Sequence, residues 1–321
     1  MTTNQLLLAV AAGLIAAVVF ASATTGAAPL QVILYFLTAL PLYLAALGIG
    51  PIAGLIASVT AMLAIALLNP VSAAIFGIST GVPAVIATRL ALLGRQNENG
   101  QAEWYPIGRI VFASAMVGGM LAALVVLSLG NDTNALTKNM RFVVESFFDK
   151  QVPQVPGAPT VSEAQKDEIV AQSIAFLPYT IAALSMLTTL LNLWLSGRIT
   201  LASGRLVRPW PELSALTLPN IAPIVLVVAM ALSFMDGLPG MLAGAFAGAT
   251  TFAFALVGLA LIHALTRGSP WRNFVLAALY LVLVLNLRLG SVALALAGLA
   301  ETIFHYRARG DDPPPSNADQ R

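Results

Sequence analysis

The residues most able to do chemistry are the few polar side chains that interrupt long apolar stretches. Asp236, Asn286 and Arg288 are the clearest examples. Hydrocarbon penalises a charge by about 2.5–3.5 kcal/mol on insertion scales, so such residues are either paired or functional. We expect all three near one membrane face, where Asp236 and Arg288 could pair and the group could bind a small molecule. The alternative is that each makes only a helix-to-helix contact.

No pattern in the chain indicates an enzyme. It has no Walker A loop, HExxH motif or dinucleotide fingerprint. Cysteine is absent, which excludes thiol nucleophiles, disulfides and cysteine-ligated metals. The two histidines, His263 and His305, lack metal-ligand spacing. We therefore predict no catalytic activity, no metal and no cofactor.

Two series of small residues recur at four-residue spacing, and they predict close helix packing. The first is Gly50, Gly54 and Ala57; the second is Gly240, Gly244 and Gly248. Small residues at this spacing let helix backbones approach closely. The two faces either pack inside one bundle or receive another membrane subunit.

Composition places these residues in a membrane protein. Hydrophobic residues make up 58% of the 321 positions and charged residues only 9%, whereas soluble domains carry about 25% charged residues. The net charge of +2 gives no reason to expect nucleic acid as a partner. We expect an all-α, polytopic bundle of about ten spans (8–10), because a span needs about 20 apolar residues. The segments are 6–23, 30–49, 51–68, 71–93, 107–129, 173–196, 219–235, 239–264, 272–288 and 290–306.

Basic residues predict the orientation of this bundle. The sixth segment ends in Trp194 and is followed by Arg198, Arg205 and Arg208. Because arginine and lysine concentrate in cytoplasmic loops, the pattern predicts both termini inside (N-in, C-in) in the bacterial cytoplasmic membrane. The basic loop should contact lipid headgroups, and a docking site for a cytoplasmic partner is the alternative.

The longest connection, 130–172, separates N-terminal helices (1–129) from C-terminal ones (173–309). Leu136, Met140, Val143 and Phe147 recur at helical spacing there and predict an amphipathic helix at the outer interface. Ser162 begins a capping-box pattern that predicts a helix start. The polar tail, 310–321, should be disordered.

The NLWLSGR and GLAETIFHYRAR segments resemble the YybS-like family of uncharacterised bacterial polytopic membrane proteins. Gly298, Glu301 and Arg307 stand where members carry a glycine, an acid and an arginine. That family is distantly similar to the substrate-binding subunits of energy-coupling-factor transporters. The resemblance implies a partner-contacting small-residue face, for which Gly50, Gly54 and Ala57 are the candidates.

These observations lead to two functional hypotheses. The first is a transporter-type integral membrane subunit that binds an unidentified small molecule and depends on partner proteins for energy. The second is a non-transporting scaffold for envelope growth or complex assembly. An outer cavity lined by Asn286, Arg288 and Asp236 favours the first. A flat, lipid-facing groove of small residues without a cavity favours the second.

Overall fold

The fold is a bundle of apolar helices, seen here in a computed structural model that describes residues 1–25, 28–98, 100–130, 132–151, 162–304 and 306. Arg307, His305 and the tail 310–321 lie outside the described residues. The helices are α1 (Thr3–Thr25), α2 (Ala28–Leu37), α3 (Leu40–Ile49), α4 (Pro51–Ala66), α5 (Pro70–Phe76), η1 (Gly77–Gly81), α6 (Val82–Ala91), α7 (Ile107–Leu129), α8 (Thr133–Gln151), α9 (Glu163–Ala202), η2 (Leu213–Ala215), α10 (Ala222–Leu232), α11 (Gly237–Leu265), α12 (Arg272–Leu285) and α13 (Leu287–Phe304).

Every segment predicted as a span contains helix. Within the described residues, seven helical segments are long and apolar enough to cross a bilayer, and α4, α10 and α12 are shorter apolar helices. The second segment is divided between α2 and α3, where Pro41 begins a new helix. The fourth is divided into α5, α6 and an intervening π-helical turn, η1. The protein is therefore all-helical in its apolar part, as predicted.

One short element departs from the helical prediction. Strands β1 (Gly94–Gln96) and β2 (Ala102–Trp104) form an antiparallel hairpin with Arg95 opposite Glu103. The Arg95 and Glu103 side chains form an exposed ion pair at 2.7 Å. Three-residue strands are too short to leave a detectable two-residue period in the sequence.

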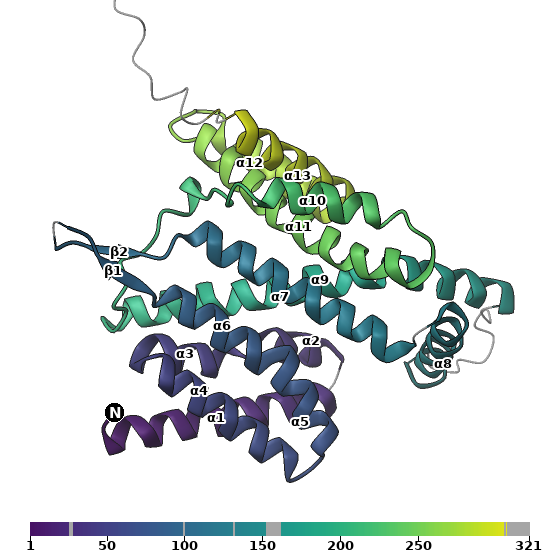
Figure 1. The fold of residues 1–321 in the computed structure, drawn as a ribbon, viewed down its shortest axis with the longest axis horizontal. Helices are drawn as coiled ribbons and strands as arrows, with labels where there is room; N and C mark the ends of the chain where they lie inside the picture. Colours follow the sequence, from purple (N-terminus) through teal and green to yellow (C-terminus); the bar gives the residue numbers. More distant parts are fainter. Residues whose placement is uncertain (26–27, 99, 131, 152–161, 305, 307–321) are drawn as a thin grey trace, which may run out of the picture.

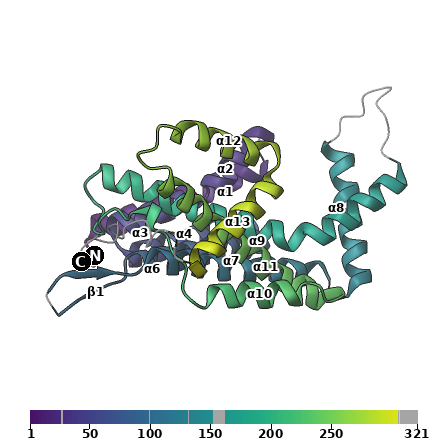
Figure 2. The same ribbon diagram turned by 90° about the horizontal axis from the view of Figure 1, so that it is seen from above.

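The helices are arranged in layers around α7 and α9. Figure 1 shows α1–α6 on one side of this central pair and α10–α13 on the other. One buried cluster joins α1, α3, α4, α5 and α6, and a second joins α7, α9, α10, α11 and α13. Seen from above, α8 and the start of α9 project away from the bundle (Figure 2).

The 40-residue helix α9 is much longer than one bilayer crossing. It rises about 60 Å, twice the roughly 30 Å hydrocarbon core. The predicted capping box is present: the Ser162 hydroxyl accepts from the Gln165 amide, and the Gln165 side chain accepts from the Ser162 amide. The predicted helix start at Ser162 is thus confirmed, and the helix continues without interruption into the sixth predicted span.

The amphipathic helix α8 packs on the projecting part of α9. Its buried stripe is Leu136, Met140 and Val144. Val143 and Phe147, which the sequence pattern grouped with that stripe, are instead exposed. The buried stripe of α8 is rotated relative to the predicted one, because its residues follow a spacing of four along the helix and Met140 and Val144 pack with Val170 of α9.

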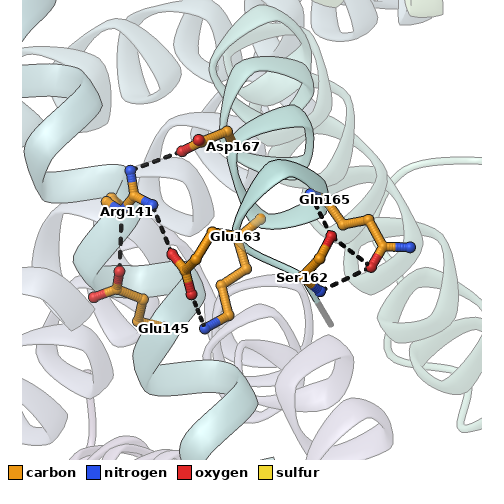
Figure 3. A network of polar contacts seen from close by, with 7 residues as sticks. Arg141, Glu145, Ser162, Glu163, Gln165 and Asp167 are labelled. Carbon is orange, nitrogen blue, oxygen red and sulfur yellow. Dashed lines mark hydrogen bonds and ion pairs between the residues drawn. The ribbon is translucent and has the colours of Figure 1, made fainter. Parts of the chain in front are cut away.

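An ion-pair cluster adds to this contact between α8 and α9. Arg141 on α8 binds Glu145 on its own helix and reaches Glu163 and Asp167 on α9 at 3.0 and 2.7 Å (Figure 3). Arg141 therefore ties α8 to the first turns of α9.

Candidate functional site

A cavity of about 1010 Å³ lies where the central helices meet the α11–α12 layer. This is at the upper end of the 300–1,000 Å³ that drug-sized ligand pockets span. Its walls come from α7, α9 and α11. Helices α3 and α6 contribute one lining residue each, and α12 contributes two. The connection from Ser203 to Ile221 crosses over it.

Two apolar helix faces form the main walls. On α9, Leu187, Leu190, Leu191 and Trp194 are spaced i, i+3, i+4 and i+7, so they share one face. On α11, the cavity is lined by the face that includes Leu256, Leu259, Ala260 and His263. Leu187 and Trp194 remain 38% and 46% exposed, so this part of the α9 face is open.

Both faces lead into a basic rim. α9 and α11 run toward the same end of the molecule, on the side of the β hairpin (Figure 1). Beyond Trp194 and His263 the lining carries Arg208, Arg267 and Arg272. Glu212 is the one acid among the described lining residues, so positive charge is in excess by two.

Arg208 is the most unusual group of the rim. It is half-buried, and its guanidinium donates to the Ala91 carbonyl at 3.2 Å. Within the described chain, no carboxylate lies within ion-pair distance of it. Desolvation lowers the pKa of Arg208 from its ordinary value, because burial disfavours the charged form. A half-buried cation without a counter-ion costs free energy, which an anion bound beside it would recover.

The other two arginines are held in place by hydrogen bonds. Arg267 donates to Glu212 at 2.9 Å and to Ser214 at 2.7 Å. Hydrogen bonds from Ser214 and Arg267 lower the pKa of Glu212 from its ordinary value. Arg272 donates to the His263 carbonyl at 2.9 Å.

The crossing loop is fixed to the bundle at several points. The Thr217 carbonyl lies directly against Gly108 on α7, where any side chain would collide with it. Leu216 and Leu218 are buried on either side. The Trp210 ring packs against Gly197 of α9, and the Arg198 guanidinium lies over the same ring, 5.1 Å from its centroid. The basic loop is therefore an ordered cover of the cavity.

Of the three arginines that the sequence singled out here, one lines the cavity. Arg208 does so, whereas Arg198 stacks outside it on Trp210 and Arg205 is exposed. His263, Arg267 and Arg272 line the same cavity and were not recognised as site residues. Their shared position follows from the ends of α11 and α12 meeting the loop after α9, which no local spacing reveals.

The structure does not bring Asp236, Asn286 and Arg288 together as one binding site. Asp236 precedes α11 and is exposed. Asn286 accepts a hydrogen bond from the Leu289 amide and so caps α13. Arg288 lies over the Phe176 ring at 4.6 Å, and no ion pair between it and Asp236 is present in the described structure. The part of α11 between Asp236 and Leu256, the first α11 residue of the cavity lining, also separates Asp236 from the cavity by about 30 Å.

The predicted small-residue faces lie inside the bundle. Gly54 packs on Ala46 of α3, and the Ala57 carbonyl touches Gly13 of α1. Gly244 and Gly248 pack on Tyr179 of α9. These positions are occupied by the chain's own helices, which matches the packing alternative.

Two of these glycines serve turns instead of helix faces. Gly50 has a φ of +142° and no atom near the place of a side chain, so it forms the turn between α3 and α4. Gly240 packs on the Met235 carbonyl in the turn before α11.

The family-like C-terminal residues belong to the contact between α11 and α13. Gly298 meets the Phe254 carbonyl, and Gly258 meets the Leu294 carbonyl, so the two backbones touch. Glu301 is buried one turn further along α13.

These features define a polytopic α-helical membrane protein with a large cavity between its helix layers. Residues 14–302 match the family model described as "Predicted membrane protein (DUF2232)". The chain belongs to this family of membrane proteins. No curated protein and no solved structure matches it.

Proposed function

We propose that this chain is a transporter-type integral membrane subunit that binds a small molecule in the cavity between α9 and α11. The observation that carries the proposal is a cavity with two apolar helix walls and a basic rim. Pockets of this kind, mostly apolar with a few convergent polar groups, are typical of small-molecule sites.

The cavity favours binding over the scaffold hypothesis. A scaffold would present a flat small-residue groove to its partners. Here the faces around Gly54 and Gly244 are covered by helices of the same chain. The chain carries no Walker A loop, so a transport cycle would take its energy from partner proteins.

The proposed placement is about ten spans in the bacterial cytoplasmic membrane, with the cavity rim and both termini inside. Support comes from the start of α1, the hairpin and the end of α9, which lie toward one end of the molecule (Figure 1). The arginines of the cavity rim add positive charge at that end.

Single cysteines test this placement, because the chain has none of its own. Ser203→Cys should react with a membrane-impermeant maleimide only after the cells are opened. Asp236→Cys, at the other end of α11, should react in intact cells and serves as the control. Labelling of position 203 in intact cells would contradict the orientation.

Affinity purification with mass spectrometry tests the transporter role. Recovery of a membrane coupling subunit together with ATPases is the expected result. Recovery of wall-synthesis proteins alone would reject the transporter role in favour of the scaffold.

A further inference from the structure

The order of groups along the cavity wall matches one class of ligand. The apolar face of α9 extends over about 10 Å from Leu187 to Trp194. The parallel face of α11 ends at His263. The basic side chains of Arg208 and Arg272 line the cavity beyond these two apolar faces. A molecule that follows this wall meets hydrocarbon first and positive charge last.

We propose that the cavity binds an anionic amphiphile, with its chain along the α9 and α11 faces and its phosphate or carboxylate at Arg208 and Arg272. The proposal rests on the proposed function and names its ligand class. Guanidinium groups recognise carboxylate and phosphate by paired hydrogen bonds. Arg208 and Arg272 donate to main-chain carbonyls, and neither forms an ion pair with a carboxylate of the described residues.

The third rim arginine has a different part. Arg267 is bound to Glu212 and Ser214, and this contact ties the crossing loop to the end of α11. It shapes the rim and is not the primary anion ligand. The rim arginines therefore differ in role: Arg208 and Arg272 are the proposed anion ligands, and Arg267 holds the crossing loop.

The occupant enters beside α12, the least packed helix around the cavity. None of the α12 residues is buried. Its Tyr280 lines the cavity and makes a 3.3 Å hydrogen bond with His263 of α11. A chain arriving from the bilayer between α11 and α12 would break this contact.

Binding of dodecyl phosphate to the full chain in a neutral maltoside detergent tests the ligand class. The fluorescence of Trp194 and Trp210, both on the cavity wall, reports occupancy. Dodecanol has the chain without the charge, and inorganic phosphate has the charge without the chain. We expect dodecyl phosphate to bind at least tenfold more tightly than either.

Substitutions in the rim give a matched comparison. Arg208→Gln and Arg272→Gln should each weaken dodecyl phosphate binding about tenfold or more, as for a lost charge-assisted hydrogen bond. Arg205→Gln removes the same charge from the same loop but lies outside the cavity, so it should leave the affinity unchanged. Leu190→Trp fills the apolar wall and should block binding, with the unfolding temperature showing that the variant is folded.

The results divide clearly. Equal binding of dodecanol and dodecyl phosphate, or equal loss in Arg205→Gln and Arg208→Gln, would overturn the proposal. Displacement of the probe by phosphatidylglycerol and not by phosphatidylcholine supports it and assigns the anion to a membrane lipid. Failure of both to displace the probe supports a non-lipid amphiphile, and equal displacement by both overturns charge selection. Because no partner protein is present, these outcomes are independent of the copurification experiment.

Discussion

Replacing Gly258 or Gly298 by alanine tests how α11 and α13 are held together. Each new Cβ would fall on a carbonyl oxygen of the opposite helix, that of Leu294 or Phe254. Since both obstacles are backbone, no side-chain rotation relieves the overlap and the helices must separate. Overpacking of a well-packed core costs about 1–3 kcal/mol. Alanine returns at most about 1 kcal/mol through its higher helix propensity.

The expected net loss is about 1–2 kcal/mol for each substitution. At about 2–4 °C per kcal/mol, the unfolding temperature in detergent should fall by roughly 2–8 °C. The double variant should lose less than the sum of the two, because the first substitution already separates the helices at the shared contact.

Gly48→Ala is the matched control for this experiment. Gly48 is also within a helix, but the nearest atom to its new Cβ would be the Thr200 methyl group at 3.6 Å, an ordinary contact. The unfolding temperature should stay constant or rise slightly because of helix propensity. If Gly48→Ala destabilised the protein as much as Gly298→Ala, the loss would be a general effect of alanine and the packing argument would be wrong.

Three further predictions concern the polar contacts. Arg141→Ala should release α8, which faster amide hydrogen exchange in α8 would show, while the unfolding temperature of the bundle stays nearly constant; a bundle-wide loss would contradict this. Hydrogen bonds from Ser214 and Arg267 lower the pKa of Glu212 from its ordinary value. The contact between Glu212 and Arg267 should therefore be complete above the ordinary carboxyl pKa and be lost only as the pH falls through the lowered pKa. Protease cleavage of the crossing loop should rise over that acid range, and in Glu212→Gln it should not change with acid pH. Asn192→Leu removes the 2.7 Å bond from its amide to the Phe36 carbonyl and should cost about 0.5–2 kcal/mol, measured by thermal unfolding; an unchanged stability would show that this buried bond contributes nothing net.

The sequence predicts the helices well because their signal is local. Length, hydropathy and the Gly50-Pro51 and Asn69-Pro70 breaks are read from neighbouring residues, and each predicted span contains helix. The capping box at Ser162 was found for the same reason, since its two bonds join residues three apart. The rotation of the α8 stripe was missed because it depends on where α9 passes.

The site was much less predictable, because it depends on contacts between distant segments. Polarity inside apolar stretches selected Asp236 and Arg288, but it cannot distinguish a helix end in the interface from a binding group. The basic loop was recognised as a marker of orientation. What makes Arg208 part of a cavity is the proximity of α6, which ends 117 positions before it, and α11, which begins 29 positions after it.

The small residues show why the same pattern supports opposite predictions. Gly54 and Gly244 have the spacing that would suit either a partner helix or a neighbour in the same chain. Inside the bundle, close approach of α4 to α3 and of α11 to α9 uses up these faces. α9 packs on α3 near its end, where Thr200 meets Gly48, and on α11 nearer its start, at Tyr179. Its Leu187–Trp194 face lines the cavity between the two layers. The glycine contacts thus account for the cavity. Gly244 and Gly248 let α11 touch α9 in the first half of both helices. Further along, leucines of α9 and α11 face each other, and the two helices remain apart there.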